Sequence, residues 1–176
     1  FGLNKINQSN YNFDKNLYVK IVSPNFLLSE YNTKSEISQL KKLIKISDPQ
    51  KNKKTLFIWP EGIFRESMLQ DIKQYKDIFY NNFSENHLIV LGINNAKPSE
   101  DFKEEKIYNS LVILNNNLEI LSIYNKIKLV PFGEFLPFEK IFYNFGLKKI
   151  TRGYNSFSAG NERELINLGK NFNKKS

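Results

Sequence analysis

Apolar and polar residues along this chain form two kinds of pattern, short apolar runs and longer segments with apolar residues at helical spacing. The short runs are rich in β-branched and aromatic residues and predict five strands, at residues 17–22, 55–59, 87–93, 107–114 and 118–124. Asn115-Asn116-Asn117 separates the last two runs, and its composition predicts a hairpin turn.

Two longer segments, residues 35–46 and 66–83, have the spacing of amphipathic helices. Thr33 and Glu36 predict a capping box at the start of the first helix. The expected order is therefore β-α-β-α-β-β-β. Strands that alternate with amphipathic helices predict an α/β layered fold.

The polarity of the chain changes near both of its ends. Residues 1–16 are polar and rich in asparagine, and we expect a linker or mobile end there. Residues 17–160 hold all the predicted elements and form one domain. Residues 161–176 become polar and basic, which predicts a frayed tail. No apolar run approaches the roughly 20 residues that span a bilayer, and no signal peptide is visible.

Composition narrows the classes of function. A net charge of +8 raises the alternative of a basic non-enzymatic binding module for nucleic acid or an acidic membrane. The lysines are scattered and no RNA-binding motif is present, so we expect no nucleic-acid partner. The absence of cysteine excludes disulfides and thiol catalysis by these residues. His87 has no second ligand at metal-binding spacing, so no metal is expected. The sequence has no Gly-rich phosphate loop, and no cofactor is expected.

Candidate chemistry lies where predicted strands end. Glu61 follows the run 55–59 in the motif WPEG, where a rigid, partly desolvated carboxylate suits a general base; a solvated turn acid is the alternative. Lys126 follows the last strand and could face a developing oxyanion, or could be an ordinary surface lysine. Glu134 lies in residues 130–137, where two prolines, a glycine and large apolar residues predict a shaped loop.

A dense aromatic and apolar patch follows, from Phe135 to Leu147, with lysines and an arginine at its border. Such a patch suits a membrane interface or the entrance for an acyl chain. Core packing against a part of the protein outside these residues explains it equally well.

Three motifs carry a family resemblance: WPEG at 59–62, YNKIKLVPFGEFLPFE at 124–139 and YNSFSAG at 154–160. In this order and at these separations they resemble the bacterial apolipoprotein N-acyltransferase family, within the carbon–nitrogen hydrolase (nitrilase) superfamily. The resemblance covers about residues 17–160. It implies a four-layer α-β-β-α sandwich, of which this chain would hold the first, incomplete part.

The resemblance also implies roles: Glu61 as general base, Lys126 as the oxyanion-stabilising lysine and Glu134 as a supporting acid. In that family a cysteine thiolate takes an acyl chain from a phospholipid. The acyl group then passes from this thioester to the N-terminal cysteine amine of a diacylglyceryl lipoprotein. The family works at the bacterial inner membrane, with this domain facing the periplasm on a bundle of membrane helices.

The departure from the family is the missing nucleophile, since the chain contains no cysteine. We therefore expect an internal piece of such an enzyme, inactive alone, for which a downstream fragment with the cysteine could be a partner. Contact with the membrane would come through helices outside this chain and through the Phe-rich loop 132–147. A piece of a soluble nitrilase-like amidase is the alternative within the superfamily.

Overall fold

The computed structural model describes residues 16–26, 33–99, 105–135, 156–162, 168 and 172. The elements follow the predicted order: β1 (Tyr18–Ile21), α3 (Glu36–Ser47), β2 (Thr55–Ile58), the 3₁₀-helix η1 (Leu69–Tyr75), α4 (Lys76–Asn82), β3 (His87–Pro98), β4 (Glu105–Leu114) and β5 (Ile120–Asn125). The second predicted helix is thus divided into a 3₁₀ and an α-helical part. In these described residues no helix is both long and apolar enough to cross a membrane.

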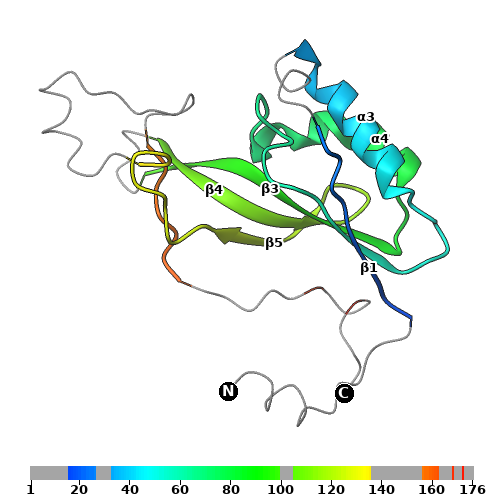
Figure 1. Cartoon of the computed structure of the whole chain (residues 1–176). Coiled ribbons are helices and arrows are strands. Elements are labelled where there is room, and N and C mark those ends of the chain that lie inside the picture. Colours follow the sequence, from blue (N-terminus) through cyan, green and yellow to red (C-terminus); the bar gives the residue numbers. More distant parts are fainter. Residues whose placement is uncertain are drawn as a thin grey trace, which may run out of the picture.

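In the described part of the chain the strands form one mixed sheet in the order β1-β2-β3-β4-β5 (Figure 1). β1, β2 and β3 are parallel, whereas β4 is antiparallel to both β3 and β5. β5 therefore runs in the same direction as β2 and β3. The carboxyl ends of β2 and β5 consequently lie at the same edge of the sheet.

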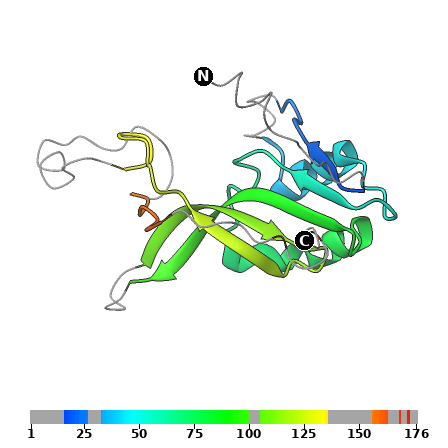
Figure 2. The same ribbon diagram turned by 90° about the horizontal axis from the view of Figure 1, so that it is seen from below.

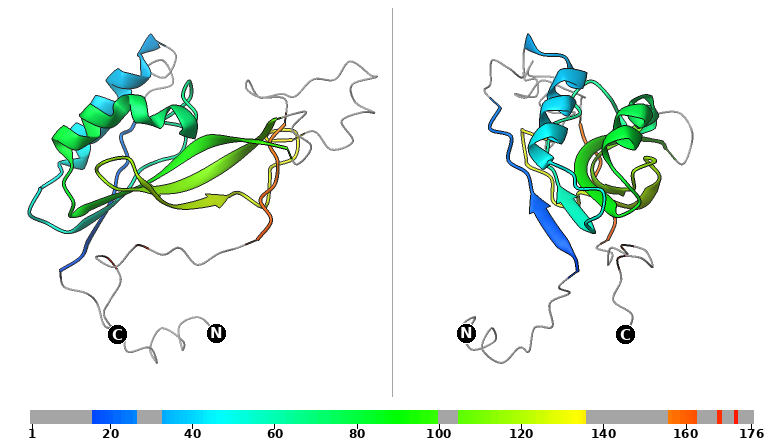
Figure 3. Two further views of the ribbon diagram at one scale, coloured as in Figure 1. Left: turned by 180° about the vertical axis from the view of Figure 1, so that it is seen from behind. Right: turned by 90° about the vertical axis from the view of Figure 1, so that its right-hand side faces the viewer.

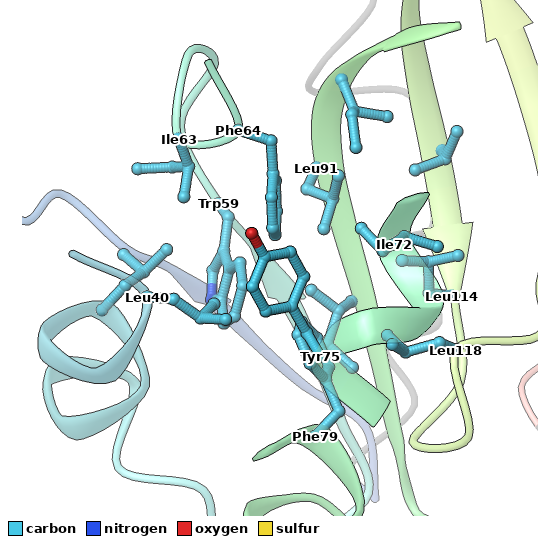
Figure 4. Close-up of a cluster of buried hydrophobic side chains, with 14 of the residues drawn as sticks. Leu40, Trp59, Ile63, Phe64, Ile72, Tyr75, Phe79, Leu91, Leu114 and Leu118 are labelled. Atoms are coloured by element: carbon cyan, nitrogen blue, oxygen red, sulfur yellow. The ribbon is translucent and has the colours of Figure 1, made fainter. Parts of the chain in front are cut away.

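The helices cover one face of this sheet (Figure 3). The core beneath them contains residues from the strands and from both helical segments, among them Leu40, Phe57, Phe79, Leu91 and Leu114, as Figure 4 shows in part. Burying each such side chain contributes about 1.5–3 kcal/mol. The predicted α/β class is confirmed.

The opposite face of the sheet is also apolar. Leu88, Val90 and Ile113 alternate with the residues that face the helices, and Phe172 packs on them. One helical layer and one sheet with a second apolar face are what the first part of an α-β-β-α sandwich would contain.

Two local predictions have different outcomes. The hairpin at Asn115 is confirmed, because its Oδ1 accepts the amide hydrogens of Asn117 and Glu119. The prediction of a capping box formed by Thr33 and Glu36 is wrong. Ser35 is the N-cap of α3 and accepts a hydrogen bond from the amide of Ser38.

Some expectations fall on residues that the structure does not describe. Residues 1–15, nearly all of the predicted linker, lie outside the described residues, and so does the aromatic patch from 136 onward. The same holds for most of the tail 161–176. Their predicted roles stay predictions.

Candidate active site

The sheet brings the three charged residues predicted for the site to one edge. Glu61 lies just after β2, Lys126 follows β5 directly, and Glu134 lies in the next loop. Asn109 of β4 links them through hydrogen bonds to both acids. The strand order therefore joins residues that are far apart in sequence.

Lys126 and Glu134 form an ion pair in which Nζ lies 2.8 Å from Oε1. The Lys126 side chain is 36% exposed and that of Glu134 only 15%. The ammonium group is thus held by the carboxylate, while part of the Lys126 side chain still faces solvent. An ammonium held in this way can stabilise negative charge that develops on a substrate oxygen.

The loop that carries Glu134 is closed by its own side chain. Oε2 of Glu134 accepts the amide hydrogen of Val130 at 2.8 Å, and the amide of Glu134 donates to the Val130 carbonyl at 2.8 Å. Phe132 at the tip has a left-handed φ of 62° and donates its amide hydrogen to the carbonyl of Phe135. An aromatic residue in this conformation is unusual and indicates a loop held by its surroundings.

The surroundings of Glu134 set its protonation state. Burial raises the pKa of its carboxyl. Hydrogen bonds from Lys126, the Val130 amide and Asn109 together lower the pKa by more than burial raises it, so the pKa lies below its ordinary value. Glu134 is therefore ionised at neutral pH. Its negative charge is paired with the ammonium group of Lys126.

Asn109 is the residue of this network that the sequence did not reveal. Its Nδ2 donates to Oε1 of Glu61 at 2.7 Å and to Oε1 of Glu134 at 2.9 Å. Its carbonyl accepts the amide hydrogen of Lys126 at 2.8 Å. One signal could have found it. Asn109, Leu111 and Ile113 are two residues apart along β4 and share one face of the sheet, so Asn109 is a polar residue in an apolar row.

Glu61 is exposed, and its main chain passes close over β3. A Cβ added at Gly92 would lie 3.3 Å from Cγ and 3.4 Å from Cα of Glu61. Glycine therefore leaves the space in which Glu61 turns toward Asn109.

Helix α3 holds the segment around Glu61 at two points. Trp59 Nε1 donates to Ser47 Oγ at 2.9 Å, at the end of α3. At its start, Oε2 of Glu36 accepts the amide hydrogens of Glu66 at 2.9 Å and Ser67 at 3.2 Å. The chain before and after Glu61 is thus anchored to one rigid element.

The segment 156–160 crosses the backbone that carries Lys126 and Glu134. The amide of Phe157 donates to the Glu134 carbonyl at 2.8 Å, and the amide of Gly160 donates to the Lys126 carbonyl at 2.9 Å. Figure 2 shows this segment in orange beside the loop after β5 in yellow. It fixes the two charged residues relative to each other.

A pocket of about 220 Å³ opens beside these residues. Glu61, Asn109 and Lys126 line it together with apolar residues of the sheet, including Ile58, Val90 and Leu111. A concave site that is mostly apolar with a few convergent polar groups is typical of small-molecule binding. This one could hold an apolar chain with a reactive polar group beside Lys126.

Comparison with known proteins agrees with the sequence motifs. The chain is 26% identical over 156 residues to the apolipoprotein N-acyltransferase of Bradyrhizobium diazoefficiens, a match that covers 84% of this chain. The enzyme of the same name from Rhizobium leguminosarum bv. trifolii is 28% identical over 116 residues, which cover 66% of this chain. That of Rhodopseudomonas palustris is 25% identical over 161 residues, which cover 87% of this chain.

The chain is thus similar to apolipoprotein N-acyltransferases over most of its own length. It spans less than a third of the length of these relatives, with 29%, 22% and 30% of them covered. No family model matches the chain. Among solved structures, an N-terminal amidase and its complex with an Asn-Glu-Ala peptide each match 64% of the chain with a TM-score of 0.38 and 18% identity.

The three motifs that carry the family resemblance meet around this site. WPEG carries Glu61, the segment 124–139 carries Lys126 and Glu134, and the described end of the third motif holds the backbone of both charged residues. Motifs that are separate in the sequence thus form one structural unit.

His87 has no part in this site. It is buried, and its Nδ1 accepts the amide hydrogen of Ser84, so its Nε2 carries the hydrogen and donates to the Gln50 carbonyl. Within the described part of the chain, no group of three or more acidic, histidine or cysteine residues could hold a metal ion.

Proposed function

We propose that this chain is part of an apolipoprotein N-acyltransferase. The observation that carries the proposal is the ion pair of Lys126 and Glu134, joined to Glu61 through Asn109 beside an apolar pocket. The similarity to curated relatives with this name supports the same activity. The acyl donor is a phospholipid, and the acceptor is the N-terminal amine of a diacylglyceryl lipoprotein.

In the first half-reaction Glu61 is the general base. It takes the proton of a thiol while the sulfur attacks the ester carbonyl carbon of the phospholipid. The negative charge on the carbonyl oxygen faces the ammonium group of Lys126, which Glu134 holds in place. The ester C–O bond then breaks, and the departing alkoxide takes the proton from Glu61, which leaves a thioester and a lysophospholipid.

In the second half-reaction the lipoprotein amine attacks the thioester carbon and gives a proton to Glu61. The oxyanion again faces Lys126 while the C–S bond breaks. The thiolate leaves and takes the proton back from Glu61, which restores the thiol, and the acylated lipoprotein carries the new amide bond. Both half-reactions use the same charged residues.

The thiol itself is not among these residues, since the sequence contains no cysteine. We propose that it comes from a part of the same protein outside the 176 residues, or from a separately encoded fragment that completes the site. The 176-residue chain alone is then inactive.

The location proposed for the intact enzyme is the bacterial inner membrane, with this domain facing the periplasm. Val130 and Phe132 are 53% and 43% exposed at the tip of the loop that Glu134 closes. Exposed apolar side chains at the tip of a loop suit contact with lipid. They support the lipid-facing role that we predict for the loop 132–147.

An acyl-transfer assay tests this proposal. The protein or pair of chains that includes these residues and a cysteine is incubated with phospholipid and a diacylglyceryl lipopeptide, and N-acylated lipopeptide is measured by mass spectrometry. We expect product from this protein and none from the 176-residue chain alone. Product from the chain alone, or none from the cysteine-containing protein, would contradict the proposal.

A further inference from the structure

The side chain of Asn109 joins two negatively charged groups that would otherwise repel each other. Its Nδ2 lies 2.7 Å from Oε1 of Glu61 and 2.9 Å from Oε1 of Glu134. Carboxylates accept hydrogen bonds and an amide nitrogen has two hydrogens to donate, so the nitrogen must face both acids. Each hydrogen then serves one carboxylate.

The same residue also fixes Lys126. The carbonyl of Asn109 accepts the amide hydrogen of Lys126 at 2.8 Å, and Lys126 Nζ shares Oε1 of Glu134 with the Asn109 amide. Asn109 thus contacts all three charged residues from the middle of β4. A strand offers a more rigid support for such contacts than a loop.

We propose that Asn109 is a positioning residue of the acyl-transfer site, which holds Glu61 at a fixed separation from the Lys126–Glu134 ion pair. This inference rests on the proposed function of that site. Asn109 binds Oε1 of Glu61. In this scheme the proton goes to the other carboxylate oxygen, Oε2.

A neutral amide suits this task better than a second cation. A lysine or arginine between the acids would compete with Lys126 for Glu134, whereas the amide binds both carboxylates and leaves the charge of the pair unchanged. Asn109 does not itself touch the reacting atoms in this scheme. Its loss should change the geometry and electrostatics of the other three residues.

Carboxyl titration tests the inference in the 176-residue chain. The pKa of Glu134 is followed by carbon NMR with labelled glutamate. We expect Asn109→Ala to raise it, because a hydrogen bond that lowers it is lost. The isosteric Asn109→Asp should raise the pKa of Glu134 further, because the new carboxylate repels the negative charge of Glu134. Asn94→Ala is the matched control, since Asn94 is the cross-strand partner of Asn109, and should leave it unchanged.

Kinetics of the cysteine-containing protein give the second measurement. We expect Asn109→Ala to lower kcat about 100-fold through misplacement of the charged groups, with KM nearly unchanged. Asn109→Ser keeps one hydrogen-bond donor, and its kcat should lie between those of wild type and Asn109→Ala.

The titration and the kinetics separate the two proposals. An unchanged pKa of Glu134 in Asn109→Ala and Asn109→Asp would overturn the positioning role even in an active enzyme. If the wild-type protein transfers no acyl group, the proposed function fails, while a raised pKa would still show that Asn109 holds the acids.

Discussion

Nζ of Lys126 lies 2.8 Å from Oε1 of Glu134, and the backbone carbonyls of both residues accept hydrogen bonds from the single segment 156–160. The ion pair is thus fixed at its side chains and at its main chain. Because each partner is held twice, the structure predicts effects on titration, stability and catalysis that can be measured separately.

Removal of the Lys126 ammonium should raise the pKa of Glu134. The folded pKa lies below the ordinary value of 4.5, so the carboxylate stabilises the fold at neutral pH and this contribution is lost as the pH falls through the folded pKa. In Lys126→Met we expect the Glu134 titration to move upward, as measured by carbon NMR. Lys128→Met, two residues further along, is the control; an equal shift in both variants would contradict the assignment.

Glu36 should contribute to stability through its buried carboxylate. It is 6% exposed and accepts hydrogen bonds from two backbone amides and from Tyr75. Glu36→Gln should reduce the free energy of unfolding by about 2 kcal/mol, measured by urea denaturation. Burial raises the pKa of Glu36, but these hydrogen bonds lower it more, to below 4.5.

The effect of Glu36→Gln should therefore depend on pH. The difference in the free energy of unfolding between wild type and Glu36→Gln should be largest above pH 4.5. It should shrink as the pH falls through the folded pKa of Glu36. Glu66→Gln, which changes an exposed neighbouring carboxylate, is the control and should change stability by less than about 0.5 kcal/mol. A difference that stays constant across acid pH would show that the carboxylate charge is not what matters.

The sequence predicted the strands and the hairpin because each has a local signal. It pointed to Glu61, Lys126 and Glu134 through their motifs, and their catalytic roles stay predictions. It could not predict Asn109 or the partners of Glu36, since these depend on contacts between distant segments. Glu36 followed a plausible helix start, yet its carboxylate bonds to the amide of Glu66, 30 residues away. Ser35 lies nearer than Thr33 to the first helical turn and took the capping position instead.

Gly160 should be intolerant of any side chain. A Cβ there would lie 2.3 Å from the carbonyl oxygen of Asn125, a distance that main-chain atoms cannot accept. We expect Gly160→Ala to reduce the free energy of unfolding by about 1–3 kcal/mol and to release the amide hydrogen bond to Lys126. Hydrogen exchange at that amide and urea denaturation measure both effects.

Gly133→Ala is the control for this substitution. Its added Cβ would lie 3.4 Å from Val130 Cγ1, an ordinary contact with a side chain. If the amide of residue 160 is equally protected from hydrogen exchange in wild type and Gly160→Ala, the hydrogen bond from this amide to the Lys126 carbonyl is contradicted.

The single histidine offers a direct measure of core integrity. Burial lowers the pKa of His87 below its ordinary value of 6.5, more than its hydrogen bonds to the backbone raise it. The neutral ring therefore stabilises the fold fully above pH 6.5, and this contribution is lost as the pH falls toward the folded pKa. Proton NMR should show one histidine signal that titrates below 6.5 in the folded chain and near 6.5 in urea. Titration at or above 6.5 in the folded chain would contradict the buried neutral ring.

The central claim, that Glu61 and Lys126 form an acyl-transfer site, is tested most directly by trapping the acyl-enzyme. The cysteine-containing protein that includes these residues is incubated with phospholipid alone, and its intact mass is recorded before and after hydroxylamine. We predict one added acyl chain that hydroxylamine removes, and no adduct within the same time in Glu61→Gln or Lys126→Met. Failure of the wild-type protein to form the adduct, or its formation at the wild-type rate in either variant, would contradict this account.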